Sequence, residues 1–221
     1  MNFSKKNHEY RMNNSNSVSK TIKLLTLLAF FIAFSSCDND NDPVLLEVES
    51  QTITNLEATQ TADYSTGTPV ITGDHIKFSF ETGTTTTGNN WDIAFRGTTI
   101  LVNGGSATAD DEPERSGNAA AYIATGTLAG ITEVDTTQLV QDDETNGLAI
   151  PTGSGNGWYS YDPTTHIISP IAGKVIVVKT HNGLYAKLEI LSYYLDGDTS
   201  GDSQYYTFNY VYQPNEGVTT F

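Results

Sequence analysis

Apolar and polar residues alternate with a period of two along most of the chain after about residue 50, and helical periodicity is nearly absent. Successive side chains of a β-strand point to opposite faces, so this alternation predicts strands with one buried face. In HIKFSF (75–80), it predicts that Ile76, Phe78 and Phe80 share the buried face. The intervening residues, beginning with His75, are then expected on a solvated face.

Four further segments have strand patterns. In WDIAFRGTTIL (91–101), alternation places Trp91, Ile93 and Phe95 on one face. KVIVVKT (174–180) is a continuous apolar run, which is typical of a strand covered on both faces. The last two segments, 184–194 and 203–212, alternate regularly, and their apolar faces consist of Leu184, Ala186, Leu188 and Ile190, and of Tyr206, Phe208, Tyr210 and Tyr212.

Two turn signals separate the last three of these strands. The first is Asn182-Gly183, the strongest short hairpin signal, because both residues tolerate positive φ in a type I′ turn. The second is DGDTSGD (196–202). The sequence thus predicts an all-β fold with predominantly antiparallel sheets that ends in a C-terminal meander. Residues 103–157, rich in Gly, Ala, Thr and Asp, predict long loops with short strands.

Residues 1–36 have the pattern of a lipoprotein signal peptide. A basic start precedes the apolar segment Leu24–Phe34, which is shorter than the roughly 20 residues of a spanning helix. Its FSSC ending is similar to a lipobox, and Cys37 is the only cysteine, so lipidation is favoured over redox chemistry. An ordinary leader with a stray cysteine is the alternative. We therefore predict a signal peptide, a lipidated cysteine with an acidic tether at 37–50, and a single β domain at 51–221.

Charge limits the partners of the expected mature chain. The full sequence has 11 Lys and Arg against 26 Asp and Glu, a net charge of −15. Without residues 1–36 the balance is 6 to 25, a net charge near −19. Such a charge repels nucleic acid and anionic membrane surfaces, so we expect membrane contact only through the lipid. The acidic DNDNDP after Cys37 is similar to export signals of Bacteroidetes-type surface lipoproteins, which favours the outer membrane and the cell surface.

Motifs for catalysis are missing from the sequence. There is no Gly-x-Ser-x-Gly elbow, P-loop or His-Glu-x-x-His pair, and TGSGNG (152–157) lacks the spacing of a dinucleotide loop. We therefore predict that the protein is not an enzyme, with a two-carboxylate hydrolase as an alternative. Two acidic stretches, 38–43 and 196–202, resemble calcium loops. Pro43 replaces the glycine of the first and Thr207 the final acid of the second, which favours a solvated tether and a hairpin loop.

Three histidines remain outside the signal peptide, and one of them has unusual neighbours. His75 is expected on a polar strand face and His181 at a loop tip. His166 follows closely behind three aromatic residues, Trp158, Tyr159 and Tyr161. A flat apolar cofactor such as haem needs aromatic walls and one or two imidazole or thioether ligands. These four residues are therefore a candidate cofactor site with His166 as the iron ligand. A hydrogen-bonded loop histidine is the alternative.

Three segments resemble the HmuY family of haem-binding lipoproteins. They are NNWDIAFRGTTILVNGG (89–105), residues 157–194, which begin GWYSYDPTTH, and YYTFNYVYQP (205–214). The resemblance implies an all-β, lipid-anchored, surface-exposed protein. It also implies that such a protein captures haem and passes it to a TonB-dependent outer-membrane receptor.

The sequence departs from this family at the expected iron ligands. The resemblance implies two axial ligands, His with His or Met with Met, one before the Gly-Trp segment and one just after it. No His or Met lies between Trp91 and Trp158, so such a pair cannot be assembled. If haem or a related tetrapyrrole binds, we expect one ligand from His166, with Tyr159 or Tyr161 as an oxygen donor or stacking wall. The alternative is a non-enzymatic binding or interaction lipoprotein on the same fold that has lost haem ligation.

Overall fold

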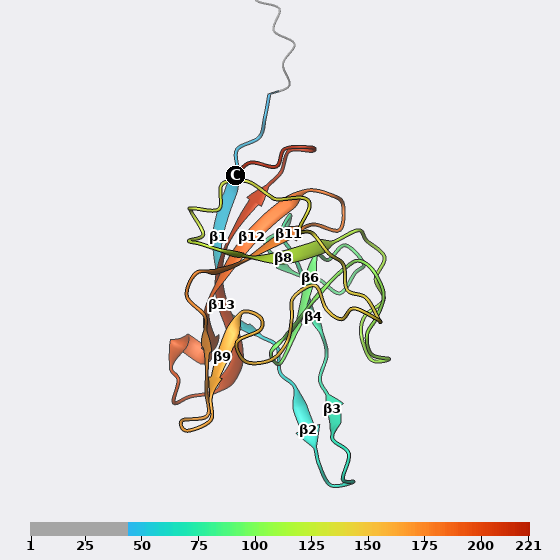
Figure 1. Ribbon diagram of the computed structural model, residues 1–221, viewed down its shortest axis with the longest axis vertical. Helices are drawn as coiled ribbons and strands as arrows, with labels where there is room; N and C mark the ends of the chain where they lie inside the picture. Colours follow the sequence, from blue (N-terminus) through green and yellow to red (C-terminus); the bar gives the residue numbers. More distant parts are fainter. Residues whose placement is uncertain (1–43) are drawn as a thin grey trace, which may run out of the picture. The chain divides into compact units, whose positions relative to one another are not determined.

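The computed structural model describes residues 44–221. Its compact unit, Leu45–Phe221, is built almost entirely of strands and loops, which confirms the predicted all-β class (Figure 1). The expected signal peptide, Cys37 and the first half of the acidic tether lie outside the described residues. Within residues 44–221, no helix is long and apolar enough to span a membrane.

The larger sheet has five antiparallel strands in the order β1-β13-β12-β11-β8. Their bounds are β1 (Glu49–Glu57), β8 (Ala120–Thr125), β11 (Lys174–Lys179), β12 (Tyr185–Tyr194) and β13 (Ser203–Gln213). The last three strands of the chain are neighbours, which confirms the C-terminal meander. Apolar side chains of β11 are buried on both faces of the sheet, as its continuous apolar run predicts.

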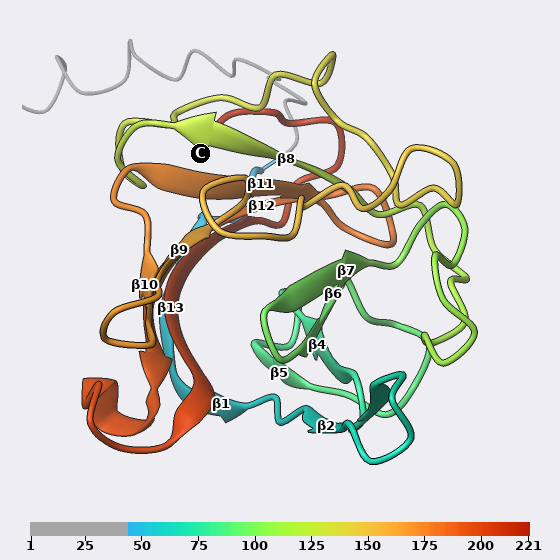
Figure 2. The same cartoon turned by 60° about the horizontal axis from the view of Figure 1, so that its bottom comes forward.

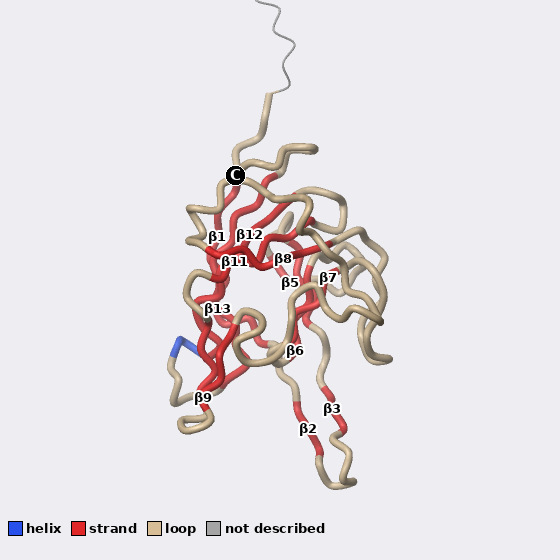
Figure 3. Tube along the Cα trace, in the orientation of Figure 1, coloured by secondary structure: helices blue, strands red, loops and turns tan. Residues whose placement is uncertain are grey.

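The smaller sheet has four antiparallel strands in the order β5-β4-β6-β7. These are β4 (Ile76–Ser79), β5 (Thr84–Thr85), β6 (Ile93–Arg96) and β7 (Thr99–Val102). Two separate hairpins join β2 (Thr61–Asp63) to β3 (Val70–Thr72) and β9 (Tyr159–Asp162) to β10 (Ile167–Pro170). Figure 3 shows long loops on both sides of β8 and one short helical turn, η1 (Leu195–Gly197), so the loop-rich reading of 103–157 is confirmed.

The main hydrophobic core lies between the two sheets, which face each other in Figure 2. Phe78 of the smaller sheet packs edge to face against Phe208 and Tyr210 of β13, with ring centroids 5.4 and 5.8 Å apart. Edge-to-face pairs of this kind contribute roughly 0.5–1.5 kcal/mol each beyond the buried area. The predicted aromatic face of β13 is confirmed, because Tyr206, Phe208, Tyr210 and Tyr212 are all buried.

Trp91 does not share a face with the neighbours predicted for it. Ile93 and Phe95 belong to the main core, whereas Trp91 packs on the other side of the smaller sheet with Ala94 and Leu101. Alternation holds only within a strand, and β6 begins at Ile93. The prediction for Trp91 was therefore wrong.

The Asn-Gly hairpin between β11 and β12 exists, but its turn type differs from the prediction. The Gly183 N–H donates to the Thr180 carbonyl oxygen (3.1 Å), so His181 and Asn182 are the central residues. Gly183 follows them with φ +95, whereas Asn182 has no positive φ. This is the longer hairpin loop in which a glycine after the turn adopts the left-handed conformation.

Candidate functional site

Trp158 and Tyr159 lie in the hydrophobic core. The Trp158 side chain is 2% exposed, and its Nε1–H donates to the Thr98 carbonyl oxygen (3.1 Å). Its ring packs against Tyr193 and Tyr206, with centroids 5.7 and 5.3 Å away. Trp158 and Tyr159 therefore do not form the exposed aromatic wall that the sequence predicted.

Tyr161 and His166 form an exposed pair on that hairpin. The Tyr161 hydroxyl lies 2.6 Å from Nδ1 of His166, and Tyr161 is 40% exposed. His166 has φ +60, which is uncommon for a residue with a side chain, and its N–H donates to the Asp162 carbonyl oxygen (2.8 Å). The tight turn thus places the imidazole beside the phenol, so two of the four predicted site residues meet.

The pair offers one ligand position for a metal centre. A tyrosine oxygen and a neutral imidazole nitrogen are both known iron ligands in haem proteins. If Nδ1 of His166 accepts a hydrogen bond from the Tyr161 hydroxyl, the phenolic oxygen becomes more electron-rich and is the better iron ligand of the two side chains. If Nδ1–H donates instead, the Nε2 lone pair is free. In either case the pair supplies one axial ligand and not two.

His181 has a structural role that its place at a loop tip did not predict. Its Nδ1 lies 2.7 Å from Oδ1 of Asp92, and its backbone N–H donates to the same oxygen (2.8 Å). Asp92 is buried, and its other oxygen accepts the N–H of Phe80 (2.8 Å). His181 therefore lies at the tip of the β11–β12 loop, as predicted, and is also a partner of a buried carboxylate.

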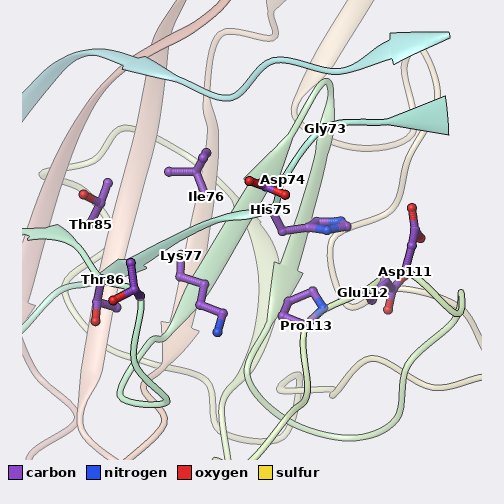
Figure 4. Close-up of a pocket in the computed structure, with 11 residues that line it drawn as sticks. Gly73, Asp74, His75, Ile76, Lys77, Thr85, Thr86, Asp111, Glu112 and Pro113 are labelled. Atoms are coloured by element: carbon purple, nitrogen blue, oxygen red, sulfur yellow. The ribbon is translucent and has the colours of Figure 1, made fainter.

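A cavity of about 740 Å³ lies beside β4, away from the predicted site. This volume is within the roughly 300–1,000 Å³ of small-molecule sites. Its lining comes from residues 73–77, 85–87 and 111–113. Figure 4 shows the imidazole of His75 extending toward the loop that carries Asp111 and Glu112, with Lys77 and Thr86 at the opposite side.

His75 is half-buried in this cavity wall and not solvated as predicted. Its Nε2 is buried and has no hydrogen-bond partner among the described residues. Burial lowers the pKa of His75 to about 4, and the nearby charge of Arg96 adds to this effect. The imidazole is therefore neutral at neutral pH. Sequence alone could not show this, because the loop that covers His75 begins more than 25 residues later.

We expect the buried His75 to lower the stability of the protein in acid. Unfolded histidine titrates near pH 6.5, whereas the folded pKa is about 4, so the unfolded chain binds a proton that the folded chain excludes. Stability then falls as the pH falls, by about 1 kcal/mol between pH 7 and 4.5, because solvent screens a half-buried imidazole. Asp111 and Glu112 weaken this effect, and Arg96 and Arg115 strengthen it.

Urea unfolding of the wild type and His75→Gln at these two pH values measures the contribution of His75. Glutamine does not titrate, so the variant should lose about 1 kcal/mol less than the wild type. Equal losses in the two proteins would contradict the assignment.

The acidic stretches do not form a metal site within residues 44–221, where no three His, Cys, Asp or Glu side chains are grouped to hold an ion. In the 196–202 loop, Asp198 accepts hydrogen bonds from the Ser200 N–H (2.9 Å) and hydroxyl (2.7 Å). These bonds stabilise a turn, as the hairpin-loop reading predicts. The first stretch, 38–43, lies outside the described residues.

Together these residues define an all-β domain of two packed antiparallel sheets, with an exposed tyrosine–histidine pair on a hairpin and a cavity beside the smaller sheet. The sequence model of the family described as HmuY protein matches residues 72–210, more than half of the chain. The chain belongs to the HmuY family, as its sequence motifs indicate.

Several solved structures are similar to this chain. An apo HmuY analog from Tannerella forsythia is 15% identical, with 78% of this chain and 100% of that chain covered and a TM-score of 0.44. A candidate lipoprotein from Bacteroides fragilis is 13% identical, with 78% and 95% covered and a TM-score of 0.42. A candidate HmuY-like heme-binding protein from Bacteroides vulgatus is 15% identical, with 78% and 97% covered and a TM-score of 0.38. No curated protein matches the sequence.

Proposed function

We propose that this chain is a surface lipoprotein that binds ferric haem through the Tyr161–His166 pair. Membership in a family of haem-binding proteins supports the ligand class. The observation that carries the choice of residues is the 2.6 Å contact between the Tyr161 hydroxyl and His166 Nδ1 on an exposed hairpin. The donor set fits one axial position of haem iron. The buried positions of Trp158 and Tyr159 leave an open site with weaker binding than a site with two ligands.

Lipid anchoring and delivery to a TonB-dependent outer-membrane receptor belong to the same proposal. The support is Cys37 directly after an apolar segment, followed by an acidic stretch. Anchoring of this kind would place the domain at the cell surface, with the acidic stretch after Cys37, predicted within 37–50, as its tether.

We expect ferric haem to give a saturable Soret shift with residues 38–221, which contain the complete compact unit Leu45–Phe221. Tyr161→Phe and His166→Ala should each weaken binding by about tenfold or more, because each removes one partner of the only proposed iron contact. Tyr64→Phe is the matched control, since Tyr64 is also an exposed tyrosine but lies on another hairpin.

The outcomes separate the function from the residues. No saturable shift with the wild type would overturn haem binding. A shift that is equal in all four proteins would overturn the assignment to Tyr161 and His166.

The second candidate is a binding lipoprotein on this fold without iron ligation. The specific observation in its favour is that no His or Met lies between Trp91 and Trp158. Titration with metal-free protoporphyrin distinguishes the two candidates. Equal affinity for haem and the metal-free ring would favour this second candidate, and a clear preference for haem would favour iron ligation.

A further inference from the structure

The two main sheets have four edge strands, β1, β8, β5 and β7, and three of these edges are covered or short. Val140 exchanges two backbone hydrogen bonds with Ala121 of β8 (2.8 and 3.1 Å), so it covers that edge. On β7, the Val102 N–H donates to the Asp142 carboxylate (3.0 Å). β5 is only two residues long. Sheets commonly protect their edges in such ways, because an uncovered edge is a template for an added strand.

The fourth edge strand, β1, is long and is not covered by any part of the described structure. It has nine residues, and its only neighbour in the sheet is β13 (Figure 1). Glu49 to Ile53 pair with β13 in regular register, and the β-bulge comes only after Ile53. Within residues 44–221, the backbone of 49–53 makes no hydrogen bond to a segment other than β13. The alternate N–H and C=O groups that face away from β13 are therefore free to pair.

Exposed carboxylates lie along this strand. Glu47 is two residues before β1, and Glu49 and Glu57 are the first and last residues of β1. All three are exposed, and none of them forms an ion pair or a side-chain hydrogen bond within residues 44–221. No Lys or Arg occurs in 44–57 or in β13. These charges favour a basic partner and disfavour a second copy of the chain, which would bring the same acids to the same edge.

Apolar side chains and a cavity adjoin the same stretch. Leu45 and Leu46 are 59% and 64% exposed just before β1. Leu46 is held in place because its N–H donates to Oδ1 of Asn215 and its carbonyl oxygen accepts Nδ2 of Asn215 (both 2.8 Å). A cavity of about 350 Å³ lies against residues 50–52 and is also lined by 209–211 and Leu128. A guest strand in which apolar residues alternate with basic ones therefore finds contacts for both kinds of side chain.

We propose that the open edge of β1 binds an extended segment of a partner protein in which basic residues alternate with apolar ones. The main chain of this segment pairs with residues 49–53 and extends the five-stranded sheet by one strand. Its basic side chains lie near Glu47 and Glu49. Addition of a strand to an open edge supplies affinity through main-chain hydrogen bonds, and neighbouring side chains supply specificity. The site is separate from the Tyr161–His166 pair and does not depend on haem.

The probe is fluorescein-labelled Thr-Lys-Val-Lys-Val-Lys-Thr amide, added to residues 38–221 and measured by anisotropy at low salt. We expect saturable binding of this lysine peptide and at least about tenfold weaker binding of the same peptide with glutamate in place of lysine. A lysine peptide with N-methylated central amides keeps its charge but cannot donate main-chain hydrogen bonds, so it should also bind at least about tenfold more weakly. No saturable binding of the lysine peptide, or equal binding of either comparison peptide, would overturn the proposal.

Two measurements locate the bound peptide on β1. Glu49→Gln should weaken the lysine peptide about threefold, and Glu144→Gln, a change at an exposed acid in another loop, should leave it unchanged. Equal effects of these two variants would overturn the placement of the basic side chains. Hydrogen exchange needs no variant: the amides of 49–53 that face the open edge should exchange rapidly, and saturating lysine peptide should slow them. Unchanged exchange rates would overturn strand addition to β1.

Discussion

Replacing Asp142 with alanine is expected to lower the free energy of unfolding by about 3–5 kcal/mol, the loss typical of one partner removed from a buried ion pair. Asp142 is 0% exposed, and one of its oxygens accepts the Val102 N–H (3.0 Å) and Arg115 Nη2 (2.8 Å). Its other oxygen accepts the Ala149 N–H (2.9 Å). The variant leaves two backbone donors without their acceptor and takes from a buried guanidinium one of its two carboxylate partners, the other being Glu112.

Urea unfolding at neutral pH measures this loss, with Glu144→Ala as the control. Glu144 is exposed two residues away and its side chain makes no hydrogen bond in the described structure, so its removal should cost less than about 0.5 kcal/mol. Arg115→Met combined with Asp142→Ala should cost less than the sum of the single changes, because each single change already breaks the Arg115–Asp142 ion pair, which the double variant loses only once. A loss below about 1 kcal/mol for Asp142→Ala would contradict the role assigned to the network.

Sequence patterns predicted the strands because their signal is local. Each strand can be recognised from residues that are close together in the sequence. The signal is the alternation in β4, β12 and β13 and the apolar run in β11. The Asp142 network could not be read in this way. Its members lie in loops and at the end of β7, up to 40 residues apart, and an aspartate in a Gly- and Thr-rich stretch looks like any other solvated acid.

In the candidate site, too, local features could be predicted from the sequence and long-range contacts could not. Tyr161 and His166 are five residues apart on one hairpin, so their proximity could be predicted. The burial of Trp158 depends instead on Thr98 in the β6–β7 turn and Tyr206 of β13, which are distant in the sequence. The cavity beside β4 joins three separate segments, and a polar residue such as His75 gave no local sign of burial. Long-range contacts therefore decide which predicted site residues can meet a ligand.

The Trp-Asp motif, which was specific enough to suggest the family, has a structural explanation in Asp92. This buried carboxylate accepts the N–H of Phe80 at the end of β4 and the N–H of His181 in the β11–β12 turn, 89 residues away. It thus connects the smaller sheet to a hairpin of the larger one. The residue before it, Trp91, fills the outer side of the smaller sheet with Ala94 and Leu101.

Asp92→Ala is accordingly expected to lower the free energy of unfolding by about 3 kcal/mol, since two backbone donors lose their acceptor. His181→Ala should cost only about 1 kcal/mol, because it removes the imidazole contact but keeps the His181 N–H bonded to Asp92. Urea unfolding of both variants tests this order, with the exposed Asp202→Ala as the control. An equal loss in free energy of unfolding for His181→Ala and Asp92→Ala would contradict this order. It would mean that the imidazole of His181, and not the two backbone amides, makes the main contact of Asp92 between the sheets.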